Sequence, residues 1–373
     1  MKQRLVGVCA VLGAGAALAV SAAPAQGATR DVYAGPFLRS DAARFEQAVG
    51  DANAYFVKRV VVREGDRVRW NFRGFHTVTF SPRGGPRVPL IVPDQGTPIA
   101  NVVDAANAPF WFNGQPRLLI NPLAAFPRGG NVFRPGRVMN SGLPLDEGEP
   151  APYTLRFARE GTYDYYCIVH PGMDGQVRVL DRDRRIPTAA ATRREAIRQE
   201  KNVLARVQRA STGAGAQQPP NTIQAGNDTN DFAVFKFFPA SATVKAGDLV
   251  TLRMDSQTGE VHTFTFGPNE NEAAYVNQIA AAFIAPDPTD TTPPPTVQVE
   301  PRAALPSEDP SLGIPTHAPT LHGNGFWNTG VLDADDDSPA IPQSMQVRFS
   351  TPGTYSYICV VHPFMRGSIT VTP

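Results

Sequence analysis

Two stretches of the sequence repeat one set of side chains that could bind a metal, in the pattern Cys-x-x-His-x-x-Met. Thiolate and thioether sulfur are soft ligands that favour Cu(I), while imidazole nitrogen keeps Cu(II) acceptable. One such loop could arise by chance, but two copies that have lost no ligand type are hard to explain by packing alone. The pattern therefore predicts a metal site in each stretch, formed by Cys167, His170 and Met173 in the first and by Cys359, His362 and Met365 in the second.

A histidine upstream of each loop supplies a fourth candidate ligand. His76 lies in residues 65–82, and His262 lies in the similar residues 247–268, where extra residues precede the histidine. Two imidazoles and a thiolate can form a trigonal plane around copper, with a thioether as a weak axial ligand. Such a geometry changes little between Cu(I) and Cu(II), which suits electron transfer. We therefore expect two copper ions per chain, one for each set of four ligands.

The elements that must position these ligands are also duplicated. Three pairs of segments match in the same order, namely 65–82 with 247–268, 138–146 with 326–334, and 161–179 with 353–371. Each copy spans roughly 150 residues, which is too long for a solenoid repeat and is the size of a domain. The sequence predicts one domain over residues 29–180 and a second over residues 221–373.

Strand signals dominate both copies. Short runs of β-branched and aromatic residues alternate with Gly-Asp turns, which indicates antiparallel β-sandwiches and an all-β fold class. Residues 83–137 and 269–325 do not match each other and are expected to be inserted loops. Residues 181–220 are the predicted linker, and 188–210 within it are expected to form a helix docked on a domain. Its apolar positions share one helical face: Ala196, Ile197, Val203, Leu204 and Val207.

These residues resemble the cupredoxins, the blue (type 1) copper proteins, and the loop at residues 359–371 is especially similar to that of amicyanin. The resemblance implies two tandem Greek-key sandwiches and electron transfer. It implies that the two thiolates carry the electronic coupling, that His170 and His362 lie near the surface with redox protein partners docking beside them, and that the methionines are axial. One departure stands out, because many cupredoxins have an asparagine where this chain has Thr77 and Thr263.

Two other functions remain open beside an electron carrier. A copper buffering or delivery protein would usually carry Met-rich or His-rich tracts, and none is present. An oxidase or a nitrite-reductase-like enzyme would need a further copper centre, but the chain has no His-x-His pair and no histidine flanking either cysteine. The two remaining histidines, His317 and His322, could contribute to such a centre, although solvent-exposed loop positions are the simpler expectation.

The N-terminus resembles a secretion signal that ends near residue 28. Lys2 and Arg4 precede a short apolar run, and small residues follow it. We therefore expect an exported protein, periplasmic or extracellular, with no stable membrane insertion after cleavage. Export would permit a Cys167–Cys359 disulfide, but each cysteine would then have to leave its own matching ligand set. The net charge is only +1 and the basic residues are scattered, so no nucleic-acid partner is expected.

Overall fold

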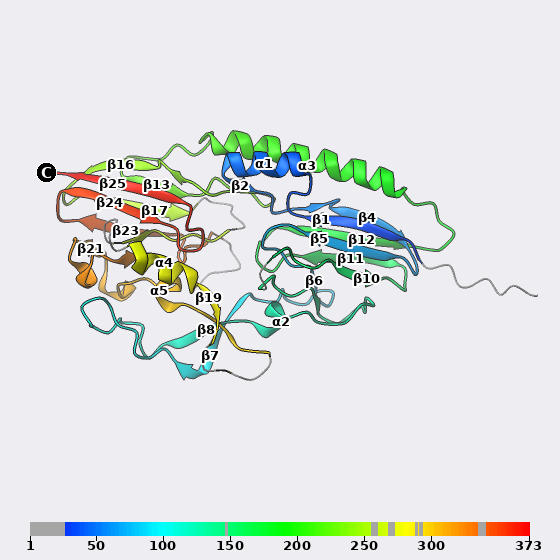
Figure 1. Cartoon of the computed structure of the whole chain (residues 1–373), viewed down its shortest axis with the longest axis horizontal. Coiled ribbons are helices and arrows are strands. Elements are labelled where there is room, and N and C mark those ends of the chain that lie inside the picture. Colours follow the sequence, from blue (N-terminus) through cyan, green and yellow to red (C-terminus); the bar gives the residue numbers. More distant parts are fainter. Residues whose placement is uncertain are drawn as a thin grey trace, which may run out of the picture.

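The computed structural model describes residues 27–145, 148–254, 260–267, 273–287, 290, 294–334 and 341–373. The predicted signal peptide lies almost entirely outside these ranges. Within them the predicted all-β class and the pair of tandem sandwiches are confirmed, and each sandwich is built from two sheets in the same strand order. Figure 1 shows the two sandwiches side by side, with the N-terminal half in blue to green and the C-terminal half in yellow-green to red. The predicted domain boundaries themselves stay predictions.

The N-terminal sandwich packs a four-stranded sheet on a five-stranded sheet. The first sheet has the order β10 (Tyr153–Arg156), β5 (Arg67–Phe72), β1 (Thr29–Ala34) and β3 (Tyr55–Phe56). The second has the order β4 (Arg59–Arg63), β12 (Asp174–Leu180), β11 (Gly161–Tyr166), β6 (Thr79–Phe80) and β9 (Met139–Asn140). Most pairings are antiparallel, as predicted, but β1–β5 and β4–β12 are parallel.

The C-terminal sandwich repeats this arrangement strand for strand. Its first sheet has the order β15 (Phe237–Phe238), β13 (Thr222–Ala225), β17 (Leu249–Met254), β23 (Ser344–Phe349) and β21 (Thr316–His317). Its second has the order β16 (Ser241–Lys245), β25 (Arg366–Thr372), β24 (Gly353–Ile358), β18 (Thr265–Phe266) and β22 (Trp327–Asn328). The internal sequence repeat is therefore a structural repeat, and among the sandwich strands that the structure describes only β21 has no counterpart.

The period-2 pattern of the strands explains where each core lies. In the N-terminal half, Val68 and Trp70 of β5 are fully buried and face Val177 of β12 and Val60 of β4 in one cluster. The alternate residue Arg69 points outward. Burying a large apolar side chain stabilises the fold by about 1.5–3 kcal/mol. A Trp70→Ala change would therefore remove one of the largest single contributions, about 3–5 kcal/mol.

The inserted segments form a sheet that both halves share. It has the order β19 (Ile284–Pro286), β20 (Val297–Val299), β8 (Pro116–Ile120) and β7 (Ile91–Pro98), so it joins strands from both inserts through the pairing of Gln298 with Leu119. Arg117 of β8 reaches Asp287 across the two halves at 2.6 Å. The inserts were expected to be loops, but they hold the two sandwiches together (Figure 1).

Further contacts between the halves come from a second small sheet and from apolar packing. β2 (Gly50–Asp51) pairs antiparallel with β14 (Ala233–Val234). Phe110 and Phe112 of the first insert pack in one cluster with Ile358 and Val360, the neighbours of Cys359. The N-terminal half therefore helps to cover the ligand loop of the C-terminal half.

The expected linker helix is confirmed as α3 (Ala189–Ser211), which runs along one edge of the molecule in Figure 1. The Thr188 hydroxyl caps it by accepting from the Ala191 amide at 3.1 Å. Ala196, Val203, Leu204 and Val207 are buried as predicted, whereas Ile197 of the predicted face is only half-buried. The helix packs on α1 (Arg39–Ala48), β1 and β3.

The other helices are short: α2 (Pro122–Ala125), α4 (Ala273–Ala281), α5 (Pro301–Ala304) and the 3-10 turns Pro310–Leu312 and Leu321–Gly323. Among the residues described, no helix combines the length and apolar character needed to cross a membrane.

Candidate metal centres

Each candidate site is assembled at one end of a sandwich from two separate loops. In the N-terminal half, His76 lies between β5 and β6, while Cys167 directly follows β11. The turn between β11 and β12 is closed by two backbone hydrogen bonds, from the Met173 amide to the His170 carbonyl at 3.1 Å and from the Cys167 amide to the Met173 carbonyl at 3.0 Å. This turn presents three of the four predicted ligands from one side, and the strand-linked His76 supplies the fourth.

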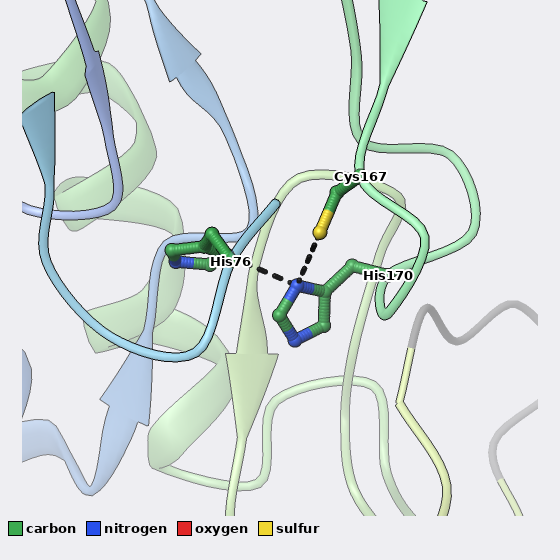
Figure 2. A group of neighbouring side chains, drawn as sticks. All are labelled: His76, Cys167 and His170. Atoms are coloured by element: carbon green, nitrogen blue, oxygen red, sulfur yellow. Dashed lines mark hydrogen bonds between the residues drawn. The ribbon is translucent and has the colours of Figure 1, made fainter. Parts of the chain in front are cut away.

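The N-terminal donor atoms converge on one point, as Figure 2 shows. The Nδ1 atoms of His76 and His170 lie 3.0 Å apart, and the Cys167 Sγ lies 3.5 Å from the His170 Nδ1. All three donor atoms lie within 4.8 Å of one another, and all three side chains are buried. Lone pairs that meet away from solvent need a cation or a proton between them, so this donor set fits a metal ion.

The C-terminal half repeats this geometry. The Nδ1 atoms of His262 and His362 lie 3.2 Å apart, and the Cys359 Sγ lies 3.7 Å from each of them. The turn carries the same two closing hydrogen bonds, from the Met365 amide to the His362 carbonyl and from the Cys359 amide to the Met365 carbonyl. His262 and Cys359 are buried, whereas His362 is partly exposed.

The two predicted axial methionines and the two thiols are all buried. Met173 and Met365 are each 1% exposed and lie in the same core clusters as Cys167 and Cys359, respectively. Burial raises the pKa of each thiol, but the adjacent imidazoles outweigh it and lower both pKa values well below the ordinary thiol value. Both cysteines are free and buried, so neither takes part in a Cys167–Cys359 disulfide.

Thr77 and Thr263 occupy the place where the family often has asparagine, and each one ties the two ligand loops together. The hydroxyl of Thr77 accepts a hydrogen bond from the Ile168 amide at 2.9 Å, and that of Thr263 accepts from the Val360 amide at 2.9 Å. The backbone amides of the threonines donate to the cysteine sulfurs, at 3.3 Å in the first site and 3.4 Å in the second. Threonine therefore provides the tether.

A carboxylate lies on the outer side of several of the imidazoles. Glu260 Oε1 is 2.9 Å from the His170 Nε2, and Glu260 Oε2 is 3.6 Å from the His362 Nε2. Asp228 Oδ2 is 3.7 Å from the His262 Nε2. Burial would raise the pKa of the Glu260 carboxyl, but the facing imidazoles, His170 first, hold it at about 2. Carboxylates in this position fix the tautomer and the orientation of a metal-binding imidazole.

The sequence interpretation did not include Glu260 or Asp228. A signal for Glu260 was present, because the extra residues in the second copy stand directly before His262 and include Glu260. An insertion beside a ligand is a place where a new contact can be added. Asp228 lies far from the ligands in sequence and has no comparable signal.

The expectation that His317 and His322 are solvent-exposed loop residues is wrong. His317 is 2% exposed, packs against Phe266 and Phe349, and its Nε2 lies 3.1 Å from the Gly325 carbonyl. Burial lowers the pKa of His317 to about 4. The insert folds back on the sheet at β21, which pairs with β23 and carries His317 inward.

His322 binds carboxylates from both halves of the chain. Its Nδ1 lies 3.1 Å from Asp104 Oδ2 and its Nε2 lies 3.0 Å from Glu308 Oε1. Burial opposes the effect, yet these two carboxylates raise the pKa of His322. The metal-binding clusters found in the described part of the chain include neither His317 nor His322.

Part of the chain is similar in sequence to a curated amicyanin. The chain is 37% identical over 59 residues to amicyanin-alpha of Methylorubrum extorquens, a match that covers 15% of this chain and half the length of that relative. The chain is cupredoxin-like. No protein-family model matches it.

Solved cupredoxin structures also match, at lower similarity. The oxidised plastocyanin of Dryopteris crassirhizoma is 21% identical, and the match covers 40% of this chain and 99% of that one with a TM-score of 0.21. A reduced Cu(I) form of an amicyanin variant at pH 4 is 16% identical, and the match covers 43% of this chain and 88% of that one with a TM-score of 0.20. These TM-scores are too low to support an argument, so the cupredoxin-like fold rests on the sheet order and the amicyanin match.

Proposed function

We propose that this chain is an exported electron-transfer protein with one type 1 copper site in each sandwich. The observation that carries the proposal is the convergence, twice in one chain, of two imidazole Nδ1 atoms and a thiolate beside a buried methionine. This donor set matches that of blue copper centres and agrees with the copper chemistry expected of cupredoxin-like proteins. Export rests on the sequence of residues 1–28 and on the localisation typical of such carriers.

The residues would divide the work in the same way in both sites. The thiolates of Cys167 and Cys359, with His76, His170, His262 and His362, would hold the ion, and Met173 and Met365 would be the weak axial donors. Bound copper would supply the one-electron Cu(II)/Cu(I) couple. The buried tethers through Thr77 and Thr263 would keep the ligand geometry fixed, so that little reorganisation accompanies electron gain or loss.

Redox protein partners were predicted to dock near both His170 and His362. The His170 side chain is 6% exposed beneath the other half of the chain, whereas that of His362 is 15% exposed. Phe364, which is 59% exposed, stands beside the His362 ring with a centroid distance of 6.2 Å. We therefore place the proposed docking of partners on the His362 side, over Phe364.

The first test is a titration of the mature protein with Cu(II), followed by visible absorption and electron paramagnetic resonance. An intense thiolate-to-copper band that saturates at two copper ions per chain is the expected result. Absence of that band would overturn the type 1 assignment. Colourless, readily exchanged copper without redox turnover would instead support copper buffering or delivery. A third copper lost on His317→Ala and His322→Ala, with oxygen or nitrite turnover, would support the enzyme alternative.

A further inference from the structure

The two candidate copper sites face each other across one buried carboxylate. His170 turns its Nδ1 toward Cys167 and its Nε2 toward Glu260 Oε1. His362 turns its Nδ1 toward Cys359 and its Nε2 toward Glu260 Oε2. Two imidazoles that belong to different sandwiches therefore meet at the two oxygens of a single side chain.

The protonation state expected of the His170 and His362 imidazoles favours their contact with the Glu260 carboxylate. An imidazole that uses Nδ1 as a metal ligand carries its proton on Nε2, and Nε2 is then a hydrogen-bond donor. Both Nε2 atoms point at carboxylate oxygens, which only accept. The His170 contact, at 2.9 Å, has the length of a charge-assisted hydrogen bond, whereas the His362 contact, at 3.6 Å, is longer than a hydrogen bond.

The bridge is held from both halves and shielded from water. Glu260 belongs to the C-terminal half, two residues before His262, and its Oε1 also accepts from the Asn53 side-chain amide of the N-terminal half at 3.1 Å. Glu260 is 7% exposed and Asn53 is 1% exposed. The nearby pairing of β2 with β14 fixes the two halves relative to each other at this point.

We propose that Glu260 is a positioning residue through which the two copper sites exchange an electron within one chain. This inference rests on the proposed function. The electron crosses the His362 ring, the Glu260 carboxylate and the His170 ring in either direction. The site that releases it is oxidised by one electron, and the other site is reduced by one electron. No proton is gained or lost, because both Nε2–H bonds and the carboxylate are unchanged.

A kinetic experiment tests the path. In the Met365→Gln background the axial donor of one site changes, so the two blue bands can be distinguished. The copper-loaded protein is partly reduced by a radiolytic pulse, and the electron is followed between the bands. We expect a first-order phase whose rate does not depend on protein concentration. Glu260→Gln should slow this phase, and Glu260→Ala should slow it by an order of magnitude or more, because a gap replaces the contacts.

A matched control separates the bridge from the interface. Glu308→Gln also removes a carboxylate that links the two halves, at His322, but it touches no predicted ligand. Its electron-exchange rate should equal that of the parent. An unchanged rate in Glu260→Ala, in a protein that still binds two blue coppers, would overturn this inference alone. Absence of the blue band in the wild type would overturn the proposed function instead.

Nuclear magnetic resonance gives a readout that is independent of electron flow. In the diamagnetic Cu(I) protein, the Nε2–H protons of His170 and His362 should exchange slowly with water and shift downfield. Glu260→Ala should make both protons exchange fast, while Glu260→Gln, which keeps the shape of the side chain, should retain at least the His170 signal. Fast exchange of both protons in the wild type would contradict the bridge.

Discussion

The two ligand loops have the same ligands at the same spacing, yet they lie in different surroundings. At the position after the His-Pro pair, the N-terminal loop has Gly172 and the C-terminal loop has Phe364. Gly172 has φ +85° and presses against Asn230 of the other half, so that an added Cβ would lie 2.8 Å from Asn230 atoms. Phe364 is 59% exposed. The position before the methionine is thus an internal contact in one copy and an exposed position in the other.

Under the proposed function, this difference would let the two sites divide their roles. Here the N-terminal histidine, His170, is covered by the C-terminal half through Glu260, and His362 keeps the more exposed position. The comparison suggests an outer site that meets partners and an inner site that communicates through the outer one.

The largest effect is expected from replacing one ligand cysteine at a time, which should remove one copper site and leave the other. Cys167→Ser should leave one blue copper, in the outer site, and Cys359→Ser should leave one, in the inner site, because each thiolate serves its own cluster. A bulky oxidant such as ferricyanide should then react faster with the Cu(I) form of Cys167→Ser than with that of Cys359→Ser. Stopped-flow absorption measures both rates. Equal rates would remove the distinction between an inner and an outer site.

The next largest effect is expected when Gly172 and Phe364 are each replaced by the residue of the other loop, and it concerns the free energy of unfolding. Gly172→Phe forces a ring into the contact with Asn230 and a non-glycine residue into positive φ, at a cost of about 3 kcal/mol in the free energy of unfolding. Phe364→Gly changes a mostly exposed position and should cost under ~1 kcal/mol. Urea unfolding of the copper-loaded proteins measures both values. A Gly172→Phe protein as stable as the wild type would show that the inner loop is not tightly covered.

Sequence alone predicts the repeated features well and the unique ones poorly. The β-class, the linker helix at residues 188–210 and the convergence of the ligand residues all follow from patterns that occur twice or have a clear period. The shared sheet of β8 and β20 could not be predicted, because its strands lie in unmatched inserts and pair across a distance of more than a hundred residues. The burial of His170 was missed for the same reason, since it depends on how the two halves pack.

His322 gives the halves a pH-dependent contact that the N-terminal copy does not duplicate. Its pKa is raised in the folded chain, so its stabilising effect is fully present below the unfolded value of about 6.5 and is lost as the pH rises through the folded pKa. His322→Gln should therefore destabilise the protein by about 1–2 kcal/mol at pH 6 and by less at pH 9. Urea unfolding at both pH values measures this.

The control for His322 is one of its own partners. Glu308→Gln removes one of the two carboxylates and should reproduce part of the same pH dependence, with a smaller loss at pH 6 because Asp104 remains. An equal loss at pH 6 and pH 9 in His322→Gln would mean that the side chain acts by packing and not by charge.

The smallest effect is expected from removing the threonine hydroxyls that tie the ligand loops together. It concerns the difference in reduction potential between the two proposed copper sites. The Thr77 hydroxyl lies 3.8 Å from the Cys167 Sγ and can donate to it. Thr265 donates its own proton to Asn328, so the Thr263 hydroxyl must donate to Thr265, at 2.9 Å, and has no proton left for Cys359. The inner thiolate therefore accepts one more hydrogen bond than the outer one.

A hydrogen bond to the thiolate withdraws charge from the sulfur and favours Cu(I), so the inner site should have the higher reduction potential. Thr77→Val and Thr263→Val both remove a loop tether, but only Thr77→Val removes a bond to sulfur. Thr77→Val should therefore lower the reduction potential of the inner site, and Thr263→Val should lower that of the outer site by less. The difference between the two decreases should be about 20–40 mV, which corresponds to about 0.5–1 kcal/mol. Spectroelectrochemistry of the single-centre cysteine variants measures each potential separately. Equal decreases in potential would mean that the two sites differ in exposure alone. A larger decrease at the inner site would mean that the inner copper holds the electron at rest, because its potential is the higher one. The outer copper would then be oxidised and ready to accept the next electron.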